Sequence, residues 1–259
     1  MINIISIALA IVAILLFFLS QRHQRESERL KQEFIAVVTH KFRTPMTGIR
    51  WAINMLRHDV SLQQKDDLIK EIERANERLV EIIDLLTGFS TLENKAQYSY
   101  QFISLPNLFE TTLPKYSQII RDKKMHFDID VNGDVPAVYI DKSRIQFVID
   151  TLLENALKYT PPNGHIGIKL VRQDQTVILS VSDTGVGLSP VEMSRLFNKF
   201  WRSDYAKTID PEGMGLGLYA VKTIVEHHGG RVWAESKGRD QGTTFYVQLK
   251  ISGYGFKIR

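Results

Sequence analysis

The chain has 259 residues, of which 44% are hydrophobic and 24% are charged, with 33 Lys and Arg against 29 Asp and Glu. It contains no cysteine, which excludes disulfides, cysteine-ligated zinc and thiol catalysis. The net charge of +4 is small and the basic residues are scattered along the chain. We therefore interpret the charges as a mixed, solvated surface and expect no nucleic-acid partner.

The N-terminus is the one break in composition. Residues 4–19, IISIALAIVAILLFFL, carry no charge and with their neighbours approach the roughly 20 residues that span a bilayer. A cleaved signal peptide has a basic start and a small-residue cleavage site, and neither is present. The basic run that follows, QRHQRESERLK, predicts that this side faces the cytoplasm. We expect a single-pass anchor at residues 1–20 in the inner or plasma membrane, a juxtamembrane linker at 21–30, and a cytoplasmic remainder.

Two long helices are predicted next. Apolar residues recur at steps of three and four from about Gln21 to Arg57, and again from about Leu62 to Leu92. The short polar connection between them predicts a helical hairpin at residues 31–95. One hairpin cannot bury both apolar stripes, so we expect two copies to pair as a four-helix bundle.

Strand-like alternation begins at about Phe102 and predicts a separate α+β domain over residues 101–252. The predicted strands include MHFDID, HIGIKLVR, TVILSVS and TTFYVQL. Helices are predicted between them at about Pro106–Arg121, Ser143–Tyr159 and Gly217–His228.

Two stretches of this domain carry residues suited to a metal ion and a nucleobase. In LLENALKYTPP, the amide of Asn155 can ligate a hard cation such as Mg²⁺, and Lys158 on the same face can approach a phosphate. In SDTGVGL, Asp183 ends a strand and can accept the amino group of an adenine, while Gly185 and Gly187 allow close backbone approach. An exposed polar helix face and an ordinary turn are the alternative interpretations.

Two further stretches are suited to phosphate. In LFNKFWRSD, Lys199 and Arg202 can reach an anion. The alternative interpretation of this stretch is a small apolar cluster under a loop. In EGMGLGLY, three glycines precede a helix whose N-terminus can bind an anion. A dinucleotide fingerprint is rejected because no strand precedes these glycines, and a P-loop is rejected because its Lys-Ser/Thr ending is missing.

A histidine in the first helix completes the set. His40 lies in VVTHKFRTP, where Pro45 follows within about one turn at a cost of roughly 3 kcal/mol to a helix interior. Without the rest of the chain, a helix-bending proline near a surface histidine is the simpler interpretation. We hypothesise instead that bending at Pro45 lets a catalytic domain reach His40 and withdraw.

The ordered set of stretches resembles a known family. Asn-Lys, Asp-x-Gly-x-Gly, a Phe-rich stretch and Gly-x-Gly-x-Gly resemble the N, G1, F and G2 boxes of the histidine-kinase ATP-binding domain, a member of the gyrase-like ATPases. THKFRTPMTGI resembles the phosphoacceptor box of that family, usually written His-Glu-Leu-Arg-Thr-Pro-Leu. Over about residues 30–250 the chain is similar to a membrane-anchored sensor histidine kinase of a two-component system.

The resemblance implies a helical-hairpin dimerisation domain followed by an α/β-sandwich ATP-binding domain, with ATP and Mg²⁺ as cofactors. By similarity, His40 attacks the γ-phosphorus of ATP and the phosphoryl group then passes to an aspartate on the receiver domain of a cytoplasmic response regulator. Thr44 matches a position used in the reverse, phosphatase reaction. A homodimer is implied as the working unit.

The resemblance also assigns nucleotide contacts. Asn155 is expected to hold Mg²⁺, Lys158 and Tyr159 to face the phosphates, and Asp183 to bind the adenine. The other positions that the resemblance implies for the nucleotide are Gly185, Gly187, Lys199, Arg202, Gly213, Gly215, Leu216, Gly217, Leu218 and Thr244.

Two departures from the family pattern weaken the expected activity. Lys41 replaces the acid that usually follows the histidine, and a cation cannot accept the proton of the imidazole. Thr151 replaces the first asparagine of the N box, so Mg²⁺ binding is expected to be weaker or shared with Asp150 or Glu154. We predict slow autophosphorylation. The alternative is a catalytically weakened ATP-binding dimer that acts as a phosphatase or scaffold for a response regulator. A gyrase-like ATPase or a serine kinase fits the paired helices poorly.

Overall fold

The computed structural model describes residues 32, 35–58, 61–92, 95–211 and 213–251. The predicted anchor at 1–20 and linker at 21–30 lie outside these residues. Within the described ranges, no helix has both the length and the apolar content needed to cross a bilayer. The chain divides into two compact units, Met1–Asp84 and Leu85–Arg259.

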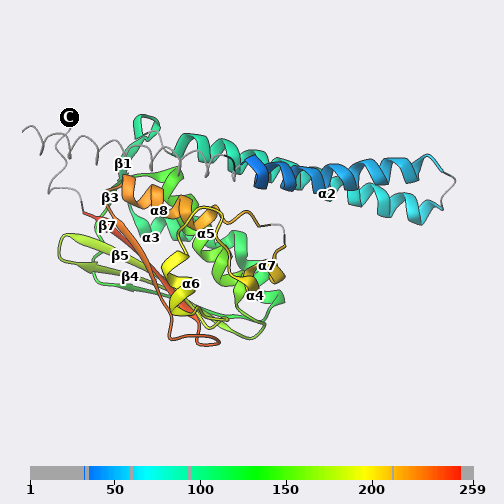
Figure 1. Cartoon of the computed structure of the whole chain (residues 1–259). Coiled ribbons are helices and arrows are strands. Elements are labelled where there is room, and N and C mark those ends of the chain that lie inside the picture. The colour runs from blue at the N-terminus through cyan, green and yellow to red at the C-terminus, as the bar shows by residue number, and fades with distance from the viewer. Residues whose placement is uncertain (1–31, 33–34, 59–60, 93–94, 212, 252–259) are drawn as a thin grey trace, which may run out of the picture. The chain divides into compact units, whose positions relative to one another are not determined.

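The first unit is a helical hairpin, as predicted. One helix runs through residues 35–56 and includes Pro45 without interruption, and α2 (Leu62–Leu92) has the predicted bounds (Figure 1). Ser61 and Gln64 start α2 with reciprocal bonds, because the Gln64 N–H donates to Ser61 Oγ (3.3 Å) and the Ser61 N–H donates to Gln64 Oε1 (2.9 Å).

The hairpin leaves much of its apolar surface uncovered. Ala52, Leu68, Ala75 and Ile82 are buried in this unit. By contrast, many larger apolar side chains of the same two helices are exposed, namely Ile35, Met46, Trp51, Ile53, Met55, Leu62, Ile69, Val80 and Ile83. A single hairpin therefore leaves many of its large apolar side chains exposed to solvent.

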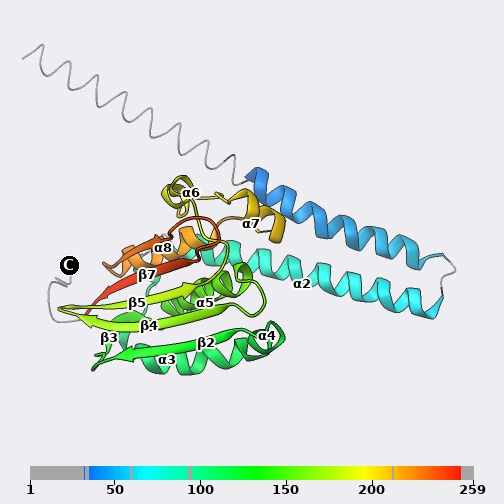
Figure 2. The ribbon, with the colours of Figure 1, turned by 90° about the horizontal axis from the view of Figure 1, so that it is seen from below.

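The second unit is an α/β sandwich. Its sheet has the strand order β2-β4-β5-β7-β6, in which only the β2–β4 pair is parallel. Three helices cover one face of this sheet (Figure 2). The sheet strands are β2 (His126–Asn132), β4 (His165–Gln173), β5 (Thr176–Asp183), β6 (Arg231–Glu235) and β7 (Thr243–Lys250), and the covering helices are α3 (Leu105–Thr112), α5 (Lys142–Tyr159) and α8 (Gly217–His227).

Shorter elements complete the sandwich. β1 (Tyr100–Ile103) and β3 (Val138–Asp141) form a separate antiparallel pair. The remaining elements are η1 (Lys95–Gln97), η2 (Leu113–Tyr116), α4 (Ser117–Asp122), α6 (Pro190–Arg195) and α7 (Asp204–Ile209). The sequence pattern missed β1, β3, β6, α6 and α7, all of which have four to six residues. Elements this short offer too few repeats for a period to be read.

Helix α5 lies at the centre of the core and is fixed at both ends. Seven of its apolar residues are buried against the sheet and the other helices. The carboxylate of Asp141 caps its N-terminus by accepting from the Arg144 N–H (3.1 Å). At its C-terminus, Lys123 Nζ donates to the carbonyls of Leu157 (2.5 Å) and Thr160 (3.2 Å). The polar residues on the remaining stripe of α5 are therefore held in place.

A second hydrogen-bonded cluster fastens the residues that precede β1 to the sandwich. The Ser99 N–H donates to Asp141 Oδ2 (2.8 Å), and the Asp141 N–H donates to His228 Nε2 (3.0 Å). His228 Nδ1 lies 2.7 Å from the Ile224 carbonyl, which can only accept, so the proton sits on Nδ1. Burial lowers the pKa of His228 and favours this neutral form.

Candidate nucleotide and phosphoacceptor sites

Two glycine loops approach the same stripe of α5. A Cβ built on Gly185 would lie 2.5 Å from the Tyr159 carbonyl oxygen, and one built on Gly217 would lie 3.2 Å from Thr151 Cγ2. Thr151 and Tyr159 are two helical turns apart, and Asn155 lies between them on the same stripe. The fold thus brings the predicted G1 and G2 boxes to the two ends of the predicted N box.

Asp183 ends β5 beside this stripe. Its Oδ1 accepts from the Gly185 N–H (2.8 Å) and the Thr243 N–H (3.2 Å). Burial raises the pKa of Asp183 to about 6, although these two bonds act in the opposite direction. Because both bonds use Oδ1, an incoming amino group would be accepted by Oδ2.

The residue predicted on the final strand, Thr244, follows the one that pairs with Asp183. On β7, Thr243, Phe245 and Val247 are buried on the side that faces the helices, and their neighbours point to the other face. Thr244 lies on that other face, where its side chain bonds Tyr246. Thr244 as a nucleotide contact stays a prediction, and Thr243 is the residue of β7 that pairs with Asp183 of β5.

Residues 196–211 and 213–216 connect α6 to α8 and contain α7. The Arg202 guanidinium donates to the backbone carbonyls of Gly213 (2.9 Å), Ala206 and Asp210. Lys199 Nζ lies 4.6 Å from the centre of the Tyr219 ring. In this structure Arg202 therefore holds the loop itself, whereas Lys199 contacts α8.

Aromatic residues and glycine shape the same loop. Phe197 and Trp201 pack against the core, which supports the simpler interpretation of the Phe-rich stretch as an apolar cluster. The Phe200 N–H donates to the Gly215 carbonyl (3.0 Å). Gly215 has a φ of 69°, and a Cβ there would lie 2.7 Å from the Phe200 carbonyl carbon, so this contact requires glycine.

The other residues predicted to contact the nucleotide differ in their surroundings. Lys158 Nζ forms an ion pair with Asp210 Oδ2 at 2.8 Å. Leu216 is buried and Leu218 packs against the core, so both side chains support the start of α8. Gly187 has a φ of 60° and belongs to a loop that residues 238–242 cover through backbone hydrogen bonds.

The acids that were expected to assist Mg²⁺ face elsewhere. Asp150 and Glu154 accept from the Tyr116 hydroxyl at 2.6 and 3.1 Å, and Lys115 Nζ lies 3.4 Å from both. Both acids lie on a different stripe of α5 from Asn155, and a partial role for them in holding Mg²⁺ stays a prediction.

Oxygen atoms of Asn155 and Thr151 remain as candidates for Mg²⁺. In the part of the chain that the structure describes, no group of three or more acidic or histidine side chains could hold a metal ion. Mg²⁺ commonly keeps several waters and takes only one or two protein oxygens beside substrate phosphates. An amide and a hydroxyl on one stripe fit that requirement, and a closed all-protein site is not needed.

The predicted phosphoacceptor is accessible in the first unit. His40 and Thr44 are exposed and lie one turn apart on the helix at residues 35–56. The Thr44 hydroxyl is 3.5 Å from the His40 carbonyl. Pro45 is buried and offers no N–H to the carbonyl of Lys41.

Comparisons with known proteins show to which family the chain belongs. Residues 30–95 match the His Kinase A phosphoacceptor domain, and residues 140–253 match the family of histidine kinase-, DNA gyrase B- and HSP90-like ATPases. The chain belongs to the two-component sensor histidine kinases. This kinase chain carries both domains in the order that the motifs predicted.

Individual relatives agree. The alginate biosynthesis sensor protein KinB of Pseudomonas aeruginosa is 30% identical over 232 residues, which are 88% of this chain and 38% of KinB. The adaptive-response sensory kinase SasA of Synechococcus elongatus is 31% identical over 251 residues, which are 92% of this chain and 64% of SasA. The chain thus spans less than two thirds of these relatives.

A solved structure has the same fold. The histidine kinase ThkA, in complex with the response regulator protein TrrA, superposes with a TM-score of 0.70 at 23% identity. The match covers 89% of this kinase chain and 65% of that chain.

Proposed function

We propose that the chain is an ATP-dependent protein-histidine kinase that phosphorylates itself on His40. The observation that carries the proposal is the meeting of both glycine loops and Asp183 along one polar stripe of α5. Together with an exposed histidine in a matched phosphoacceptor domain, this supplies both a nucleotide site and a nucleophile. A membrane anchor at residues 1–20 remains part of the proposal, on the sequence pattern alone.

In the proposed reaction, the neutral imidazole of His40 forms a bond from one ring nitrogen to the γ-phosphorus. The bond to the bridging oxygen breaks and ADP leaves, while the ring proton is lost to water or a base. Asn155 and Thr151 would hold Mg²⁺, which neutralises phosphate charge when bound. Asp183 would orient the adenine through its Oδ2. Positioning and charge neutralisation are the main demands on the protein in such reactions.

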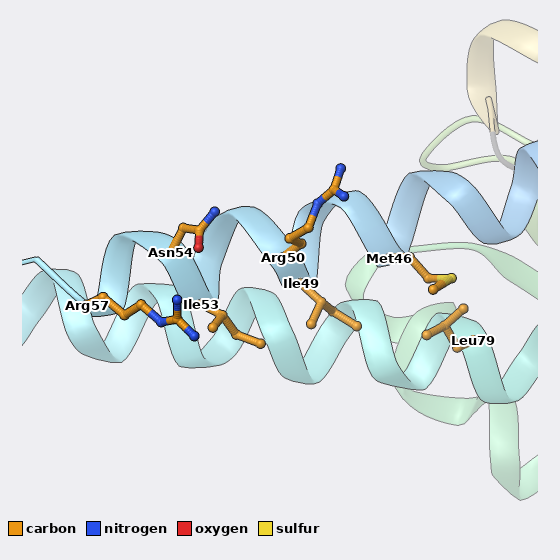
Figure 3. Close-up of a pocket in the computed structure, with 7 residues that line it drawn as sticks. All are labelled: Met46, Ile49, Arg50, Ile53, Asn54, Arg57 and Leu79. Atoms are coloured by element: carbon orange, nitrogen blue, oxygen red, sulfur yellow. The ribbon is translucent and has the colours of Figure 1, made fainter.

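We propose a second copy of this chain as the partner of the hairpin. The exposed side chains of Met46 and Ile53 border a groove of about 380 Å³ between the two helices of the hairpin (Figure 3). Ile49 and Leu79 line the same groove. Burial of such a surface contributes about 25 cal/mol per Å², which favours a four-helix bundle in the dimer.

A response regulator is the proposed acceptor of the phosphoryl group. ThkA was solved in complex with the response regulator TrrA, and this chain has the ThkA fold. By the family resemblance, the group passes from His40 to an aspartate of the receiver domain, and Thr44 serves the reverse, phosphatase reaction. The exposure of both side chains on one helix face is compatible with docking of such a domain.

Incubation with ATP and Mg²⁺ tests the kinase proposal. We expect the chain to incorporate a label that is stable in alkali and lost in acid, because the phosphorus–nitrogen bond hydrolyses in acid. The His40→Gln variant should incorporate none, while its affinity for ATP stays unchanged because His40 belongs to the other unit. Equal labelling of the two proteins would show that His40 is not the acceptor.

Lys41 is expected to make this reaction slow. A carboxylate at this position could orient the ring of His40 and accept its proton, whereas an ammonium group can do neither. We predict that Lys41→Glu raises the initial rate of autophosphorylation by roughly a hundredfold, at the lower end of general-base effects. Initial rates at saturating ATP measure this, with Arg43→Glu as the charge-matched control. A rate unchanged by Lys41→Glu would mean that another group takes the proton.

The weakened-dimer alternative keeps one observation in its favour, since both Lys41 and Thr151 depart from the family pattern. A chain that binds ATP, acquires no label, and still dephosphorylates a phosphorylated receiver domain would establish that alternative.

A further inference from the structure

The carboxylate of Asp210 lies between two cations that the family resemblance assigns to phosphate. Its Oδ2 is 2.8 Å from Lys158 Nζ and 4.0 Å from an Arg202 guanidinium nitrogen. The side chain of Asp210 is only 22% exposed and that of Arg202 only 11% exposed. Lys158 is 41% exposed, so only the Asp210 and Arg202 side of this cluster is shielded from solvent, and the Lys158–Asp210 pair is worth no more than a favourable surface pair.

The loop is built around this carboxylate. Arg202 donates to the backbone carbonyls of Ala206, Asp210 and Gly213, which closes the segment into a compact turn. A Cβ on Gly213 would lie 2.6 Å from Asp210 Oδ2, so glycine leaves the space that the carboxylate occupies. Asp210 also ends α7 and is thereby fixed in the backbone.

A carboxylate and a phosphate compete for the same cation. Both offer anionic oxygens that approach an ammonium group at about 2.7–2.9 Å. When both anions share one site, they repel each other, and the shielded environment strengthens that repulsion. ATP bound along the stripe of α5 that contains Thr151 and Asn155 must therefore either displace Asp210 from Lys158 or bind more weakly, because its phosphates are repelled by the carboxylate.

We propose that Asp210 is an internal competitor of the nucleotide's phosphates for Lys158. In the nucleotide-free chain it pairs with Lys158 and holds residues 202–211 against α5. Phosphate releases the loop by taking the lysine, so ATP affinity and loop position are coupled. This inference rests on the proposed function, because it requires that the stripe binds ATP.

Equilibrium binding of ATP and of adenosine to the full chain, measured by calorimetry with Mg²⁺ present, tests the proposal. Asp210→Asn should tighten ATP binding roughly three- to fivefold, the gain expected from removing a competitor worth up to about 1 kcal/mol. Adenosine carries no phosphate, so its affinity should stay the same and also report that the variant is folded.

Two further variants test whether the effect of Asp210→Asn depends on its contact with Lys158. Asp204→Asn removes the same charge from the same helix, but Asp204 is 98% exposed and pairs with Lys207, so ATP affinity should not change. In a Lys158→Gln background, Asp210→Asn should no longer tighten ATP binding, because no ammonium remains to compete for.

Two results would show that Asp210 does not compete with phosphate for Lys158. One is that Asp210→Asn tightens adenosine and ATP binding equally. The other is that Asp210→Asn still tightens ATP binding when Lys158 is replaced by Gln. ATP binding that is unchanged or weaker in Asp210→Asn would show the same. If the unaltered chain bound neither adenosine nor ATP, the proposed function would itself be wrong and the competition with it.

Discussion

Asp183→Asn is expected to weaken ATP binding roughly 30- to 100-fold, which corresponds to the loss of one hydrogen bond to a buried charged group. Asparagine can keep its Oδ1 as the acceptor for the Gly185 and Thr243 N–H groups. It would then present an amide NH₂ where the carboxylate presents Oδ2, so the adenine amino group would meet a donor. Calorimetric titration with ATP measures the effect, and adenosine should lose affinity to the same extent.

The same substitution should stabilise the nucleotide-free protein. Burial raises the pKa of Asp183 from 3.8 to about 6, so between these pH values the folded state binds more protons than the unfolded state. The contribution of this group to stability therefore falls as pH rises through that window, and the cost above it is at most about 3 kcal/mol. We expect Asp183→Asn to recover roughly 1–2 kcal/mol at pH 8 and about half as much at pH 5. Thermal unfolding at both pH values measures this, and a variant that melts below the parent at pH 8 would contradict it.

Asp141→Ala is expected to destabilise the second unit by roughly 2–4 kcal/mol. The substitution removes the N-terminal cap of α5 and leaves buried donors without their acceptor. The carboxylate accepts from the N–H groups of Ser99 and Arg144 and from the Ser143 hydroxyl. Burial alone would raise the pKa of Asp141, but these bonds hold it below its usual value. Its contribution is therefore present above the unfolded pKa and is lost as pH falls through the folded pKa.

Urea unfolding of the full chain, followed by a probe in the sandwich such as Trp233 fluorescence, measures the loss. Asp134→Ala serves as the control, since Asp134 is exposed on the loop between β2 and β3. A difference of less than about 0.5 kcal/mol between the two variants, the usual scatter of surface substitutions, would show that the cluster at Asp141 is not what fastens this part of the fold.

Long periodic elements of this fold could be predicted from the sequence. The bounds of α2 and the courses of α5, α8, β4, β5 and β7 follow from runs of eight or more residues with one clear period. The pair of β1 and β3 could not be predicted, because each strand has only four residues and the hydrogen bond from Asp141 to His228 joins residues that lie 87 positions apart. A local pattern carries no trace of that contact.

The candidate site was predictable by motif order and less so by side-chain direction. Asp183 lies beside the Gly185 loop, and Asn155 lies on the α5 stripe that the glycine loops approach. Thr244 points away from Asp183, because a strand alternates its faces at every residue and a shift of one position reverses the side chain. Asp150 points away from Asn155, because adjacent residues on a helix point about 100° apart. Asp210 was not predicted at all, because no motif marks a residue whose partner lies 52 positions away.

Mass spectrometry of the ATP-treated chain, carried out at alkaline pH, shows whether His40 is the phosphoacceptor. We expect one added phosphoryl group on His40, which disappears after brief acid treatment and is absent when Asp183→Asn is used at low ATP. A phosphoryl group that survives acid and maps to Thr39, Thr44 or Thr47 would contradict it, because it would show a hydroxyl rather than an imidazole as the nucleophile.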